Sequence, residues 1–139
     1  MVVMSDYSVE TVLVCDDVRR EDNGKHIIIG AFTGTIIFAE MPALMTTLAV
    51  FYEVVPRKEN WHTKIEITIK GPDGNELTKA TGSIDFPKDA NPGAFFFKIA
   101  NVPIVSEGPL QIYLGLYGEE QKLVKTLQVK KGPVPALKA

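Results

Sequence analysis

The chain has 139 residues, 45% of them hydrophobic and 23% charged, which suits one domain with its own core and excludes a wholly disordered chain. Lys and Arg total 15 against 17 Asp and Glu, and a net charge of -2 gives no general attraction to nucleic acid or to an anionic membrane. The single cysteine excludes an internal disulfide, and no apolar run approaches the roughly 20 residues that span a bilayer. The start of the chain lacks a basic stretch followed by a long apolar one, so we expect no secretory signal and a cytoplasmic protein.

Two strands joined by a tight turn are predicted near the beginning of the chain. Residues 8–18 are dense in β-branched side chains, and the Asn-Gly pair at 23–24 is a strong hairpin signal. The second strand runs from residue 26 to about 38. Gly30 and Gly34 interrupt it, which predicts a bulge, a bend or a strand that changes sheets.

A β-hairpin over residues 61–86 is the clearest prediction. Ile65, Ile67 and Ile69 alternate with polar residues, so one face of the first strand is apolar and the other polar. Residues 71–75, Gly-Pro-Asp-Gly-Asn, form the turn, and a second alternating run returns from it.

Four further segments complete the predicted strands. Residues 47–55 carry apolar side chains on both faces, which is typical of a central strand or an interface. Residues 94–100, 110–117 and 122–130 alternate or are bounded by turn residues. About eight short strands and no helix predict an all-β, antiparallel, Ig-like two-sheet sandwich, with a closed barrel as the second choice.

We expect one domain over residues 1–131, followed by an extended, Pro-containing tail at 132–139. The tail has two large apolar side chains, Val134 and Leu137. They are predicted to contact either a neighbouring copy or the surface of the domain itself.

A resemblance to a known family starts at residues 15–19, Cys-Asp-Asp-Val-Arg, and continues through Asn-Gly-Lys at 23–25 and Ile-Gly-Ala-Phe at 29–32. This pattern resembles the opening of a family of small bacterial proteins of unknown function. The resemblance implies a β-sandwich and a bacterial or bacteriophage source. It brings no activity, substrate or catalytic residue.

The predicted core consists of apolar residues that recur at every second position of the strands and so face inward. These residues are Val12, Val14, Ile27, Ile29, Ile65, Ile67, Phe95, Phe97, Ile112, Leu114 and Leu127.

Asp16 and Asp17 are the most distinctive polar pair. They are predicted to form a structural polar site, satisfying backbone donors or basic neighbours, in preference to binding a metal. Cys15 is predicted to be a buried thiol and not a nucleophile. His26 and His62 lack zinc-ligand spacing, and no phosphate-binding loop is present, so we expect no catalytic residue, metal or cofactor.

Five aromatic residues are candidates for outward positions or strand ends. If they cluster, they form a carbohydrate platform or a protein interface, and if they scatter, they are ordinary packing residues. They are Tyr52, Trp61, Phe96, Tyr113 and Tyr117.

The sequence therefore predicts a non-enzymatic structural or interaction module, a subunit of a homo-oligomer or of a larger assembly such as a phage particle. The alternative is a sandwich that binds a carbohydrate or another small ligand, and an enzyme using Asp16 or Asp17 is the least favoured class. The expected partner is protein, with no nucleic acid and no membrane, in the cytoplasm or within a virion.

Overall fold

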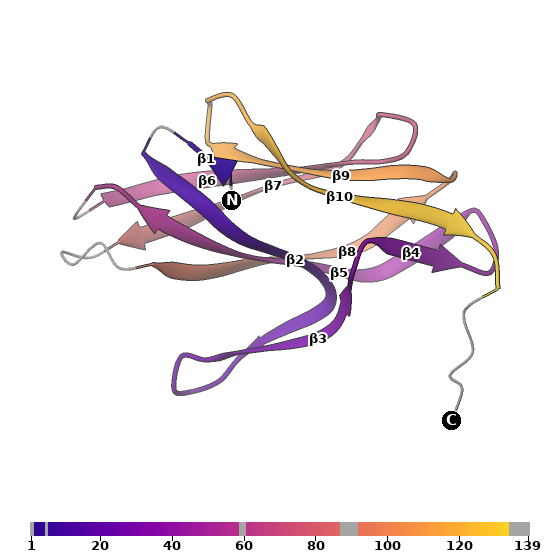
Figure 1. Ribbon diagram of the computed structural model, residues 1–139, viewed down its shortest axis with the longest axis horizontal. Coiled ribbons are helices and arrows are strands. Elements are labelled where there is room, and N and C mark those ends of the chain that lie inside the picture. Colours follow the sequence, from indigo (N-terminus) through magenta and orange to yellow (C-terminus); the bar gives the residue numbers. More distant parts are fainter. Residues whose placement is uncertain (1, 5, 59–60, 87–91, 134–139) are drawn as a thin grey trace.

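The computed structural model describes residues 2–4, 6–58, 61–86 and 92–133, which form ten strands and no helix (Figure 1). The strands are β1 (Val2–Val3), β2 (Tyr7–Arg20), β3 (His26–Phe32), β4 (Thr35–Phe38), β5 (Ala43–Pro56), β6 (Trp61–Lys70), β7 (Glu76–Phe86), β8 (Gly93–Ile104), β9 (Gly108–Leu116) and β10 (Lys122–Lys131).

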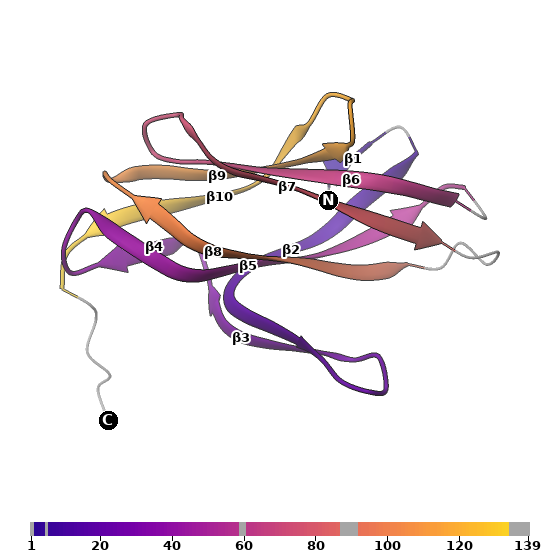
Figure 2. The ribbon, with the colours of Figure 1, turned by 180° about the vertical axis from the view of Figure 1, so that it is seen from behind.

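The strands form two five-stranded sheets that stack face to face (Figures 1 and 2). Sheet A has the order β1-β2-β5-β8, with β3 paired to β2, and sheet B has the order β4-β10-β9-β6-β7. The predicted all-β sandwich is confirmed. It has ten strands because the short β1 and β4 add to the sheets, and it is not wholly antiparallel because β4 runs parallel to β10.

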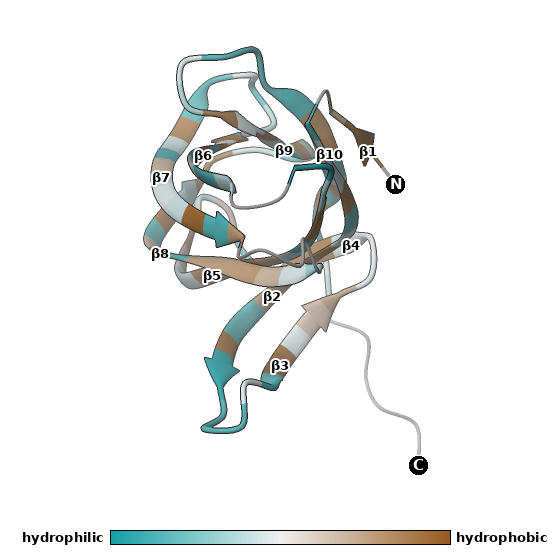
Figure 3. Cartoon of the chain, turned by 90° about the vertical axis from the view of Figure 1, so that its left-hand side faces the viewer, coloured by the Kyte–Doolittle hydropathy of each residue, from teal (hydrophilic) through white to brown (hydrophobic). Residues whose placement is uncertain are grey.

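The two sheets curl around a common core, so the molecule seen end-on has a barrel-like outline (Figure 3). The described residues of β7 and β8, which form one edge of each sheet, are not paired with each other. The sandwich therefore has an open side between β7 and β8.

Both predicted hairpins are present. β6 and β7 pair regularly from Trp61 opposite Phe86 to Ile69 opposite Thr78, the register shifts between Ile69 and Lys70, and Gly74 makes the turn with φ of 84°. β2 and β3 are joined by the Asn-Gly turn, where Gly24 has φ of 86°. Both glycines adopt backbone conformations that other residues reach only with strain.

Of the bulge, bend or change of sheet predicted for residues 26–38, a change of sheet occurs between β3 and β4. β3 pairs with β2 in sheet A, whereas β4 pairs with β10 in sheet B. Gly34 lies between them, and its carbonyl oxygen accepts a hydrogen bond from the Gln128 backbone N–H at 2.8 Å. The chain thus crosses from one sheet to the other at a residue with no side chain.

Most of the predicted core is confirmed. The residues with no measurable exposure are Val14, Ile65, Ile67, Ile112, Leu114 and Leu127. Val12, Phe95 and Phe97 are half-buried and pack against this core.

Ile27 and Ile29 are not core residues, because 41% and 40% of their surfaces are exposed. They belong to a hairpin of residues 16–32, here called the arm, which leaves sheet A and lies below its outer face (Figures 1 and 3). The ladder between β2 and β5 ends at Cys15, and beyond it β2 pairs only with β3. On the arm it is the intervening Ile28, opposite Val18, that packs against the sheet.

Candidate functional site

The five predicted aromatics do not converge on one surface. Tyr52 is 1% exposed and stacks on Phe97 with 5.9 Å between ring centroids, so its predicted outward position is wrong. It shares the inner face of β5, where every second side chain points to the core. Trp61 is half-buried at one end of the sandwich, with its ring 5.9 Å from that of Phe86.

The other described residues that were candidates for an interaction surface lie far apart in the fold. Phe96 is under the arm, Tyr113 is half-buried on the outer face of sheet B, and Tyr117 stands 63% exposed in the turn after β9. Val134 and Leu137 lie outside the described residues.

The arm builds a separate, smaller apolar cluster on the outer face of sheet A. Phe51 and Phe96 receive the ring of His26 edge-on, at 5.3 Å and 5.8 Å between centroids. Val18 of the arm is buried in the same cluster. The second apolar face predicted for residues 47–55 is therefore covered by the chain itself, and β5 is also a central strand.

Asp17 holds the arm to the sheet through charge. Its carboxylate lies 3.0 Å from the Lys98 ammonium and accepts hydrogen bonds from Arg19 Nε at 3.1 Å and from the Val18 backbone N–H at 2.9 Å. The hydrogen bond from Lys98, followed by that from Arg19, lowers the pKa of Asp17 below its ordinary value. Lys98 belongs to β8, so this contact joins the arm to sheet A.

Asp16, the other member of the predicted polar pair, is exposed and lies against Gly30 of β3. The two carboxylates therefore have different surroundings: one is ion-paired, and the other faces a glycine backbone.

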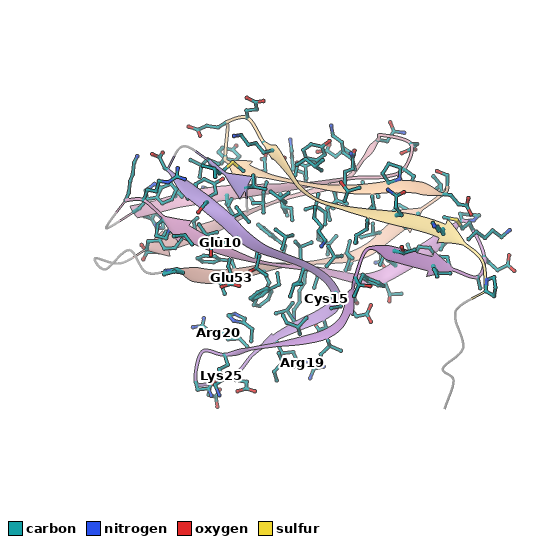
Figure 4. All side chains as sticks on the ribbon, viewed as in Figure 1. Glu10, Cys15, Arg19, Arg20, Lys25 and Glu53 are labelled. Atoms are coloured by element: carbon teal, nitrogen blue, oxygen red, sulfur yellow. The ribbon has the colours of Figure 1, made fainter. Side chains whose placement is uncertain are left out.

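Charges of opposite sign stand on the facing surfaces of the arm and the sheet. Figure 4 shows Arg20 and Lys25 on the arm, below Glu10 of β2 and Glu53 of β5. Cys15 marks the bend where β2 leaves the sheet. The apolar cluster and the Asp17–Lys98 ion pair both favour the arm lying beneath sheet A.

Cys15 has the environment of a structural thiol. It has no exposed surface, and its Sγ–H donates to the Ala49 carbonyl oxygen at 3.7 Å. Burial raises its pKa, and the charges of Asp16 and Asp17 raise it further, so the reactive thiolate is disfavoured.

The described ranges contain neither a cluster of metal-ligand residues nor a membrane-spanning helix. No three His, Cys, Asp or Glu side chains in them are grouped so as to hold a metal ion. The same ranges contain no apolar helix of membrane-spanning length.

The open side of the sandwich contains a groove of about 240 Å³. It runs along β8, between the arm and β7. Its lining includes Arg20, His26, Gly82, Ser83, Phe95 and Phe96.

A second, polar groove of about 540 Å³ lies on the outer face of sheet B. Its floor is the polar face of β6, formed by Glu66, Thr68 and Lys70. Tyr113 of β9 and Lys79 of β7 stand on either side of Thr68, because both pair with it in the sheet.

Fold and surfaces together define an all-β sandwich with a hairpin arm and two grooves. The family model described as "Family of unknown function (DUF6941)" matches residues 10–130, and the chain belongs to this family. No curated protein matches the chain. A crystal structure of the C-terminal domain of wzt aligns over 94% of this chain and 77% of that chain, with 13% identity and a TM-score of 0.47, and so weak a likeness carries no conclusion about function.

Proposed function

We propose that this protein is a non-enzymatic interaction module that pairs an extended segment of another protein chain, including a second copy of itself, with the free edge of β8. The observation that carries this proposal is β8 itself, a 12-residue strand paired only with β5 among the described residues. Unpaired backbone donors and acceptors along such an edge are a template for an added strand.

The composition of β8 also favours strand addition. Over residues 93–100 its only charged side chain is Lys98, which is engaged by Asp17. Protective features come late in the strand, at Asn101 with φ of 57° and at Pro103. The first eight residues of β8 therefore have little that discourages pairing.

The groove beside β8 would supply side-chain specificity. Phe95 and Phe96 point to opposite faces of the strand, and both line the groove. Alternate side chains of an added strand would reach the aromatic wall on one side and the arm, with Arg20 and His26, on the other.

A binding role, in place of a chemical one, is supported by the state of the reactive groups. Cys15 is buried with a raised pKa, and the Asp17 carboxylate is held by two cations. We propose a bacterial or phage source on the sequence resemblance, and a cytoplasmic or virion location on the sequence alone.

The test places a bulky charge at the mouth of the groove. Ser83→Arg should weaken assembly, because Ser83 is exposed on β7 beside the β8 edge. Thr126→Arg, at an exposed position on β10, is the matched control. Mass should be measured by light scattering over a concentration series, with amide hydrogen exchange of residues 93–100 followed in parallel.

In a β8-paired assembly these amides gain protection as concentration rises, and only Ser83→Arg removes the gain. A wild-type protein that remains a monomer at high micromolar concentration, with rapidly exchanging β8 amides, would contradict self-association. An assembly that forms without any change in β8 exchange would contradict the edge as its site.

A further inference from the structure

We infer that the polar groove on the outer face of sheet B binds a neutral, polyhydroxylated ligand, a carbohydrate. This site lies on the sheet opposite the arm and does not depend on the β8 edge. Its volume of about 540 Å³ falls within the roughly 300–1,000 Å³ typical of small-molecule sites.

Strand register builds the groove. Because β6 lies between β7 and β9, each of its outward residues has one neighbour on either side. Glu66 lies opposite Thr81 and Gly115, Thr68 opposite Lys79 and Tyr113, and Lys70 opposite Glu76 and Gln111. The Thr68 hydroxyl thus lies in a row between the Lys79 ammonium and the Tyr113 ring.

Gly115 of β9 lets the β9–β10 turn pack against one end of the groove, which Glu119 and Gln121 line. A Cβ at this position would lie 2.8 Å from the Glu120 carbonyl oxygen and 2.9 Å from Gln121 Cα, so only glycine lets the β9–β10 turn pack so closely. This packing brings Gln121 Nε2 to Glu66 Oε1 at 2.6 Å. An amide and a carboxylate are thereby fixed side by side at the end of the floor.

The buried, unpartnered hydroxyl of Thr68 is the observation that points to a ligand. Its side chain lies on the outer face of the sheet, yet the residue is only 6% exposed, and Oγ1 has no hydrogen-bond partner among the described residues. A buried hydroxyl without a hydrogen-bond partner loses its bonds to water and gains none, so such groups are rare in folded proteins unless a ligand or water molecule supplies the missing bond. A ligand hydroxyl that reaches Thr68 Oγ1 when Lys70 or Lys79 changes rotamer would supply the missing hydrogen bond.

The charges in the groove favour a neutral ligand. Lys70 and Lys79 face Glu66, Glu76 and Glu119, so neither sign has a clear excess. Lys79 Nζ already lies 3.6 Å from Glu66 Oε1 and 3.8 Å from Glu76 Oε1. The carboxylates would repel a phosphate, and the ammonium groups would repel a metal ion.

Donors and acceptors standing next to one another suit ligand hydroxyls, which both donate and accept. Tyr113 supplies an apolar ring face against which the C–H face of a sugar can pack. In the structure the Lys70 ammonium lies over this ring, 4.8 Å from the ring centroid. Lys70 is a flexible side chain and can be displaced towards a sugar oxygen.

The experiment uses the full chain on an array of neutral, sialylated and sulfated glycans, followed by titration of the best neutral glycan with NMR detection. Thr68→Val and Tyr113→Ala should each weaken binding at least about tenfold, equivalent to about 1.4 kcal/mol. Tyr117→Ala, which removes a solitary exposed tyrosine, is the control and should bind as the wild type does.

Thr68→Val also separates binding from folding. The lost hydroxyl has no protein partner, so the melting temperature should not fall while glycan affinity does. Binding to no neutral glycan, a preference for anionic glycans, or unchanged affinity in both folded variants would overturn the inference. The Ser83→Arg variant should retain glycan binding, so this test and that of the β8 edge fail independently.

Discussion

At the scale of single residues, Gly30 shows how the arm depends on a missing side chain. Its φ is 67°, and a Cβ there would lie 2.2 Å from Asp16 Oδ2. Gly24 in the arm turn has φ of 86° but open space around it. Substituting the two glycines therefore separates the free-energy cost of a left-handed backbone from the cost of a steric clash.

Gly24→Ala should destabilise the arm by about 1 kcal/mol, the usual cost of a left-handed backbone for a residue with a Cβ. Gly30→Ala should cost roughly 2 kcal/mol or more, because Asp16 must also move. The difference is measured by amide hydrogen exchange of the arm, and equal losses of protection would contradict it.

Asp17 predicts a pH dependence with a definite sign. Its folded pKa lies below the ordinary value of 3.8, so its contribution to stability is complete above that value. The contribution is lost as pH falls through the lowered folded pKa, because the protonated carboxyl no longer attracts Lys98 and Arg19.

Asp17→Asn should therefore be less stable than wild type near neutral pH, and the two proteins should converge in acid. Urea unfolding of both at several pH values measures the difference. A gap that stays constant into acid would show that the charge of Asp17 is not what stabilises the arm.

At the scale of elements, the arm has one face that packs and one that does not. Ile28 contacts the outer cluster of sheet A, whereas Ile29, its neighbour, is 40% exposed. Ile28→Ala should cost about 1–2 kcal/mol, below the usual range for a fully buried isoleucine, and Ile29→Ala less than about 0.5 kcal/mol. Arm protection in hydrogen exchange measures both, and a reversed order would mean the arm faces the other way.

At the scale of the whole molecule, two core clusters fill the sandwich, and Val12, Phe97 and Val124 contact both. Phe97→Ala removes one of these links together with its stacking on Tyr52. We expect a loss of about 2–4 kcal/mol, because the ring is only half-buried.

The shared contacts also predict that the sandwich unfolds as one unit. Trp61 fluorescence and far-ultraviolet circular dichroism should give the same transition in urea for wild type and Phe97→Ala. Separate transitions would show that the two clusters are independent.

Local structure could be predicted from the sequence alone, because the signals for strands and turns depend only on neighbouring residues. Alternation at Ile65, Ile67 and Ile69 placed one face of β6 in the core, and the turn residues at 23–24 and 71–75 placed both hairpins. The all-β class follows from the same period of two.

Which sheet, if any, each face of a strand packs against could not be predicted from the sequence, because it depends on the packing of the whole chain. The same alternation wrongly put Ile27 and Ile29 in the core, because nothing local shows that the arm leaves sheet A after Cys15. The polar face of β6 was visible in the sequence, but its neighbours Tyr113 and Gln121 come from more than 40 residues along the chain. Pairing between distant strands depends on the packing of the whole chain, and both proposed binding surfaces are made by such pairing or by its absence.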